Sequence, residues 1–147
     1  MKKRVSSAHV PEPPPETWSN CVVVGNQVFI SGVFAATEPT LEGGNSMYGQ
    51  AVVTFTKIKH LVEAAGGTMS DIVKVLIFVT DIKQRHEVWR ARREFYTGDF
   101  PASTMVEVRS LASPELLIAA EAIAVLGAGK SQNQTAGRVI ERVADHE

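Results

Sequence analysis

Two glutamates on neighbouring predicted strands are the residues of this 147-residue chain best suited to transfer protons. Glu107 and Glu121 each alternate with apolar residues, so their side chains point away from those neighbours. Paired carboxylates on adjacent strands can serve as general acid and general base. A structural role is the alternative, because a strand glutamate often accepts a hydrogen bond from a backbone amide or pairs with a base such as Arg109.

Backbone amides near Gly32 and Met105 are candidates for binding a carbonyl or carboxylate oxygen of a ligand. Glycine has no Cβ, so a ligand can approach the main chain closely at Gly32. Amide groups directed at an oxygen stabilise the negative charge that develops there during acyl or imine chemistry. These two positions therefore define a candidate oxygen-binding site.

Arg92 is a candidate cation for the same site, and it lies three residues after Trp89 on a neighbouring face of a predicted helix. We favour a surface ion pair for it, because a charge run of mixed sign usually forms a solvated face. The other charged residues of this run are Arg85, Glu87, Arg90, Arg93 and Glu94.

Hydrophobic periodicity predicts the elements that must position these residues. Apolar residues at three- and four-residue spacing predict helices, and β-branched runs predict strands, the first two of which form a hairpin around Gly25-Asn26. The order β-β-α-β-α-β-β predicts an α+β fold in which a mixed sheet carries two helices on one face. Strands are expected at 21–24, 27–31, 71–80, 104–108 and 116–125, and helices at 46–65 and 84–96.

The two ends of the chain differ from this central domain, which spans 18–126. Closely spaced prolines predict an extended, partly mobile arm over 1–17. Gly, Ser, Gln and Asn dominate after Val125, so 127–147 is expected to be a flexible tail with a short helix at 138–144. The uncovered face of the sheet would expose apolar residues in a monomer, which favours self-association.

Composition narrows the classes of partner. The formal net charge is −1, which provides no general attraction for nucleic acid or for an anionic membrane. No apolar run approaches the roughly 20 residues that span a bilayer. Cys21 stands alone, which suits a reducing cytoplasm and a buried, unreactive thiol. The four histidines are scattered and 127–131 lacks the full phosphate-loop pattern, so no metal or cofactor is expected.

Several segments, taken in order, resemble the Rid family of reactive intermediate deaminases, also called YjgF. The resemblance covers 18–124 and retains Ser31, Gly32 and Thr104. It implies a chorismate-mutase-like fold and a homotrimer with small-molecule clefts between neighbouring subunits. The matching segments are 24–26, 29–32, 64–67, 71–75, 78–81, 101–108 and 116–124.

The resemblance also implies that several cleft positions have changed. The family arginine that grips a substrate carboxylate after Pro-Ala is replaced by Ser103, which cannot supply a charged fork of donors. The family glutamate that helps to position water is replaced by Ala119. The remaining changes enlarge the aromatic or thioether surface: Trp18 for a tyrosine, Trp89 for an asparagine and Met105 for a cysteine.

The sequence therefore predicts a Rid-like protein that binds a small metabolite. Water addition to an imine, enamine or amide-like carbon is the expected chemistry, without efficient deamination of 2-aminoacrylate. A non-catalytic ligand-binding or regulatory protein is the main alternative, and an endoribonuclease or translation inhibitor is disfavoured because there is no basic stripe. The expectation of altered chemistry depends on charge, so a second cation beside Ser103, such as Arg92, would remove its main support.

Overall fold

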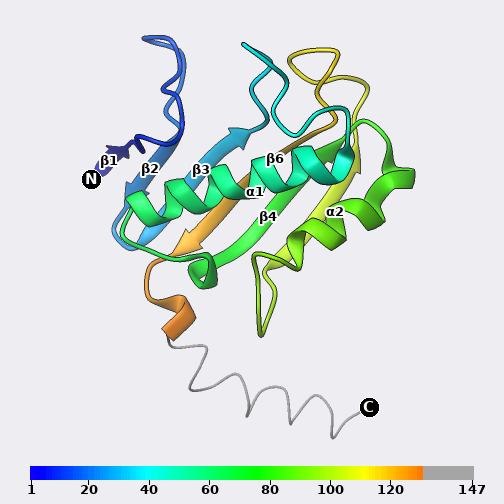
Figure 1. Cartoon of the computed structure of the whole chain (residues 1–147). Helices are drawn as coiled ribbons and strands as arrows, with labels where there is room; N and C mark the ends of the chain where they lie inside the picture. The colour runs from blue at the N-terminus through cyan, green and yellow to red at the C-terminus, as the bar shows by residue number, and fades with distance from the viewer. Residues whose placement is uncertain (131–147) are drawn as a thin grey trace, which may run out of the picture.

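A mixed sheet with the strand order β1-β2-β3-β6-β4-β5 is the framework of the fold (Figure 1). The computed structural model describes residues 1–130. Strand β4 pairs in parallel with β5, and the other neighbouring strands are antiparallel. The strands are β1 Lys2–Val5, β2 Cys21–Val24, β3 Gln27–Val33, β4 Ile72–Val79, β5 Ala102–Glu107 and β6 Ile118–Val125, and the α-helices are α1 Met47–Ala64 and α2 Arg85–Arg92.

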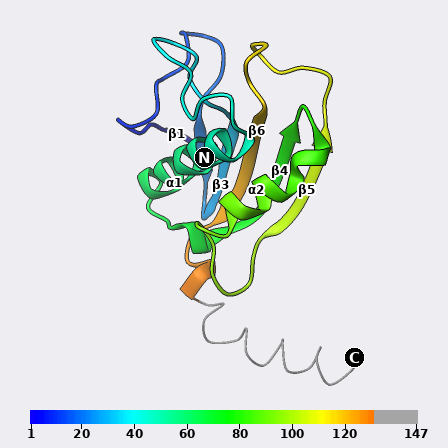
Figure 2. The ribbon, with the colours of Figure 1, turned by 45° about the vertical axis from the view of Figure 1, so that its right-hand side comes forward.

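Both helices cross the same face of the sheet, as Figures 1 and 2 show together. This arrangement confirms the predicted α+β class. Helix α1 begins after Ser46, whose side chain accepts a hydrogen bond from the amide of Gly49. Its predicted apolar stripe is buried against the sheet, with Ala51, Phe55, Ile58 and Val62 fully covered.

Helix α2 ends four residues earlier than predicted. The amides of Glu94 and Phe95 donate to the carbonyls of Ala91 and Arg92, three residues back in each case, so the chain tightens into a turn after Arg92. Tyr96 is then buried, with 5% of its surface exposed. The early end places Arg92 in the last turn of the helix.

The sheet has one covered and one open face. Val75, Ile77 and Val79 of β4 are buried beneath the helices. The open face carries alternate residues of the same strands, and Phe29 and Val106 there are 40% and 39% exposed. The expected uncovered apolar face is therefore present in the single chain.

The N-terminal segment contains a strand that the sequence pattern does not show. Strand β1 pairs with β2 along the edge of the sheet, from Lys2 opposite Val24 to Val5 opposite Cys21. Its side chains are mostly polar and exposed, and only main-chain pairing defines it, so hydrophobic alternation could not reveal it. The helix predicted at 138–144 lies outside the described residues.

Candidate functional site

The predicted site residues occupy three places in the single chain. Register decides the faces, because successive residues of a strand point to opposite sides. Ser103 and Met105 lie opposite Val75 and Ile77, on the helix-covered side at the β5 edge. Thr104, Glu121 and Ala119 lie opposite Leu76 or Phe78 on the open face. Trp18, Ser31 and Gly32 lie in or just before the β2-β3 hairpin.

Arg92 reaches the position of Ser103. Its Nη1 donates a hydrogen bond of 2.8 Å to the Oγ of Ser103. It forms no ion pair with any carboxylate of the described chain, so the surface ion pair favoured from the sequence is wrong. A guanidinium from α2 therefore lies against Ser103, so the expectation that this position lacks a positive charge loses its main support.

The surroundings of Arg92 leave two buried polar atoms without a hydrogen-bond partner in the described part of the single chain. Its Nε and the hydroxyl of Tyr96 are both buried and have no hydrogen-bond partner among residues 1–130. Burial lowers the pKa of Arg92, with Tyr96 opposing and Arg93 adding to the shift, yet a guanidinium stays charged in proteins. Burial also raises the pKa of Tyr96. We call Arg92, Tyr96 and Ser103 the Arg92 site; it presents a positive charge and unused hydrogen-bonding groups.

The other arginines of α2 behave as a mixed-sign surface. Arg90 pairs with Glu87 at 2.7 Å and lies 3.7 Å from the ring centre of Tyr48. Arg85 lies 6.0 Å from the ring centre of Trp89. Arg92 is thus distinguished from these neighbours by its burial and by its contact with β5.

The two candidate catalytic glutamates do not form a pair. Strand β4 separates β5 from β6, so the strands that carry them are not adjacent. Glu107 lies on the helix side, and its Oε1 accepts a 3.0 Å hydrogen bond from the amide of Ile82. Glu121 lies on the open face opposite Leu76. The structure supports the structural alternative for Glu107, and the hypothesis of a carboxylate pair within one chain is wrong.

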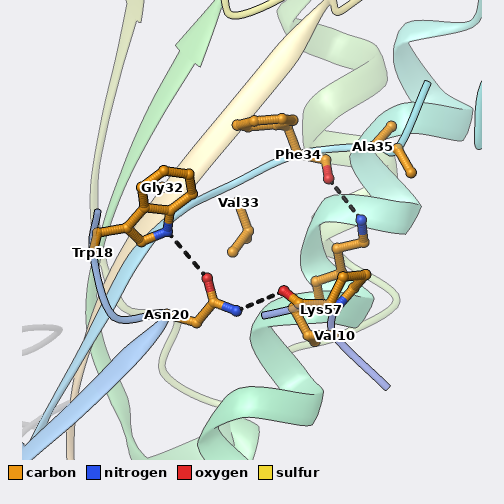
Figure 3. Close-up of a pocket in the computed structure, with 10 residues that line it drawn as sticks. Val10, Trp18, Asn20, Gly32, Val33, Phe34, Ala35 and Lys57 are labelled. Carbon is orange, nitrogen blue, oxygen red and sulfur yellow. Dashed lines mark hydrogen bonds between the residues drawn. The ribbon is translucent and has the colours of Figure 1, made fainter. Parts of the chain in front are cut away.

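Trp18 and Gly32 line a pocket of about 200 Å³ beside β3, away from the β5 edge of the sheet (Figure 3). We call it the Trp18 pocket. A Cβ added at Gly32 would meet no atom within 4 Å, so this backbone is open to a ligand. The hydroxyl of Ser31 is buried and has no hydrogen-bond partner among the described residues. Neither Trp89 nor Met105 lines the pocket, so the expected aromatic and thioether lining does not form in one chain.

Sequence reasoning missed Asn20 and Lys57 in this pocket. Asn20 accepts a 3.3 Å hydrogen bond from Trp18 Nε1 and donates one of 2.9 Å to the carbonyl of Pro11. Lys57 donates to the carbonyl of Phe34 at 2.8 Å. Neither residue forms part of a motif. The one signal in the sequence is that Asn20, a polar residue, directly precedes a predicted strand that begins at residue 21.

Metal-binding clusters of three or more His, Cys, Asp or Glu side chains are absent from residues 1–130. Cys21 is fully buried, and burial raises the pKa of its thiol to about 11, so it is a poor nucleophile near neutral pH. Within the same residues, no helix is long and apolar enough to cross a membrane.

These features define a small α+β protein with a half-buried arginine at one edge of the sheet and an apolar pocket beside β3. Residues 10–126 match the family described as Endoribonuclease L-PSP, and the chain belongs to that family, which includes the Rid and YjgF proteins. The resemblance inferred from its motifs is thereby confirmed.

Relatives with assigned names are similar over most of their length. The chain is 34% identical over 110 residues to the 2-iminobutanoate/2-iminopropanoate deaminase of Dermatophagoides farinae, covering 74% of this chain and 86% of that protein. The protein of the same name from Escherichia coli strain K12 is 36% identical over 107 residues, covering 71% and 83%.

Solved structures share the fold. A protein of unknown function from Pseudomonas aeruginosa has a TM-score of 0.77 and 36% identity, covering 86% of this chain and 93% of that chain. The TdcF protein of E. coli, solved with bound serine, has a TM-score of 0.75 and 25% identity, covering 84% and 98%.

Proposed function

We propose that this protein is a homotrimer that binds a small 2-imino or 2-oxo carboxylate, with the guanidinium of Arg92 gripping the carboxylate. The observation that carries this proposal is the 2.8 Å contact between Arg92 and Ser103, which brings a cation against the residue that stands where the family resemblance implies an arginine. The guanidinium carries further N–H donors besides the one that contacts Ser103, and these can bind an acceptor oxygen. The relatives named as deaminases of 2-imino acids support the ligand class.

Assembly would complete the site. The Arg92 site lies at the β5 edge, and the Trp18 pocket lies beside β3, with β6 and β4 between these strands. One chain therefore cannot place both beside one small ligand. In the proposed homotrimer, the Trp18 pocket of one subunit lies beside the Arg92 site of its neighbour.

The reaction of such a site is hydrolysis of the imine carbon. Water adds to the C=N bond, the nitrogen takes up protons and leaves as ammonia, and a 2-oxo acid remains. Backbone amides near Gly32 and Met105 would polarise the substrate. Ala119 cannot hold or deprotonate the water, so we expect turnover to be slow and 2-aminoacrylate to be deaminated inefficiently. Binding without turnover remains the alternative.

The test compares Arg92→Gln with Arg93→Gln, which removes the same charge from the next residue of the turn. Pyruvate serves as a stable product probe in isothermal titration calorimetry, and ammonia release from 2-iminopropanoate reports turnover. Arg92→Gln removes a charged group that can make several hydrogen bonds to the carboxylate, so it should weaken pyruvate binding by roughly 10- to 100-fold. Arg93, which is exposed, should change it by less than about twofold.

The outcomes separate the alternatives. Equal pyruvate affinity in wild type and Arg92→Gln would contradict the proposed role of Arg92. Arg92-dependent binding with no ammonia release would show the non-catalytic protein. Arg92→Lys should bind with intermediate affinity, because an ammonium keeps the charge but lacks the planar fork of donors.

A further inference from the structure

The Trp18 pocket is large enough for an apolar side chain. Its volume is about 200 Å³, whereas an engineered apolar cavity of about 150 Å³ accommodates benzene. The N-terminal arm builds one wall, since Val10 and Pro11 are lining residues and Val10 is 5% exposed. The apolar lining consists mainly of Val10, Pro11, Trp18, Val33, Phe34 and Ala35.

Hydrogen bonds already occupy the polar side chains of this pocket. Figure 3 shows Trp18 donating to Asn20, Asn20 donating to the main chain of the arm, and Lys57 donating to the carbonyl of Phe34. Lys57 also pairs with Glu42 at 2.9 Å.

The Lys57 charge is therefore neutralised within the protein. Burial alone would raise the pKa of Glu42, but hydrogen bonds from the Ala36 amide and from Lys57 hold it below its ordinary value, so the pair keeps opposite charges. A ligand carboxylate in the pocket would meet a cation that Glu42 already neutralises, whereas an uncharged apolar group needs no charged partner.

Asn20 fixes the shape of the pocket. Trp18 is 51% exposed and would be free to rotate without its indole hydrogen bond to Asn20. Asn20 is itself 5% exposed and is joined to the arm through Pro11. The indole therefore forms a positioned wall before any ligand arrives, which lowers the entropic cost of binding.

We propose that the Trp18 pocket receives the side chain of the substrate. The pocket selects 2-imino acids with a branched or aromatic apolar side chain over those with a methyl side chain. This inference rests on the proposed function, in which Arg92 holds the carboxylate. It assigns the arm residues Val10 and Pro11 and the positioning residue Asn20 to substrate specificity.

The experiment measures the ratio of two dissociation constants by isothermal titration calorimetry on the full chain. The probes are pyruvate, with a methyl side chain, and 4-methyl-2-oxopentanoate, with an isobutyl side chain. Burying the added carbons should make the second probe bind at least about tenfold more tightly to the wild type. Ala36→Leu adds bulk to the lining and should reduce the ratio to about threefold or less.

Two further variants make the result specific. Ala112→Leu makes the same change at an exposed loop residue and should keep the wild-type ratio. Trp18→Ala removes an exposed wall without disturbing the core, so it should also lower the ratio even if Ala36→Leu folds poorly.

The possible failures are distinguishable. Arg92-dependent binding of pyruvate with a wild-type ratio near one would overturn this inference and leave the proposed function intact. A ratio that neither Ala36→Leu nor Trp18→Ala changes would overturn it as well. Wild-type protein that binds neither probe would overturn the proposed function, and this inference with it.

Discussion

A guanidinium can reach one point in a fold from more than one element. Here the short side chain of Ser103 lies on β5, and the long side chain of Arg92 on α2 reaches it with a 2.8 Å hydrogen bond. This arrangement places a positive charge beside the strand, and the charge comes from the last turn of α2 and not from β5. In the proposed site, carboxylate binding and water activation are separate questions, and only the second involves residue 119.

Ala119→Glu tests whether a missing carboxylate limits turnover. Ala119 is 6% exposed in the single chain and stands where the family resemblance implies a glutamate. A carboxylate that positions or deprotonates water should raise the rate of ammonia release from 2-iminopropanoate by at least about tenfold, within the usual range of general-base effects. Steady-state ammonia assays and pyruvate calorimetry measure the two effects separately.

Ala112→Glu, on an exposed loop, is the matched control for added charge. An Ala119→Glu protein that binds pyruvate normally but releases ammonia no faster than wild type would show that a carboxylate at this position does not limit the reaction.

At the scale of elements, periodic burial made the main framework predictable and left its ends uncertain. The stripe of α1 and the continuous apolar run of β4 depend on packing that leaves a direct trace in the sequence. Strand β1 leaves none, because it is an edge strand held by main-chain bonds. The early end of α2 depends on local turn hydrogen bonds, so the direction of Arg92 could not be inferred although Ser103 and Ala119 were visible as departures from the family motif.

Gln50 joins helix α1 to the segment that leads into β6, and we expect Gln50→Met to destabilise the fold. Its side chain is fully buried. It donates to the carbonyls of Gly44 and Glu115 at 2.9 and 3.0 Å and accepts from the amide of Leu117 at 2.8 Å. Methionine has a similar size but leaves these backbone groups without their partner, which should lower the free energy of unfolding by about 3 kcal/mol.

Urea denaturation measures this change, and Gln27→Met at an exposed strand end is the control, with an expected effect within about 0.5 kcal/mol. A loss below about 1 kcal/mol in Gln50→Met would mean that other groups or solvent replace these hydrogen bonds at little cost.

At the scale of the whole molecule, the sheet separates the two parts of the proposed site. The strand order puts β6 and β4 between the Trp18 pocket and the Arg92 site. The proposed function therefore depends on assembly, because the Arg92 site and the Trp18 pocket of one chain cannot serve the same small ligand. The uncovered sheet face is the surface through which such assembly would bury apolar area.

Phe29→Asp tests this dependence directly. Phe29 is 40% exposed and pairs with Ile123 of β6 on the open face. In a trimer joined through this face, an unpaired carboxylate would be buried against apolar residues, which costs several kcal/mol. We expect wild type to sediment at three times the chain mass of 15.9 kDa in analytical ultracentrifugation and Phe29→Asp to sediment as a monomer.

Pyruvate binding should disappear together with assembly, although Arg92 and Trp18 are unchanged in the variant. Thr97→Asp adds the same charge on an exposed loop and should remain trimeric and competent to bind. A monomeric wild type that still binds pyruvate through Arg92 would contradict the intersubunit site. A trimeric Phe29→Asp would instead place the interface elsewhere, because the open face would then not be the surface that assembly buries.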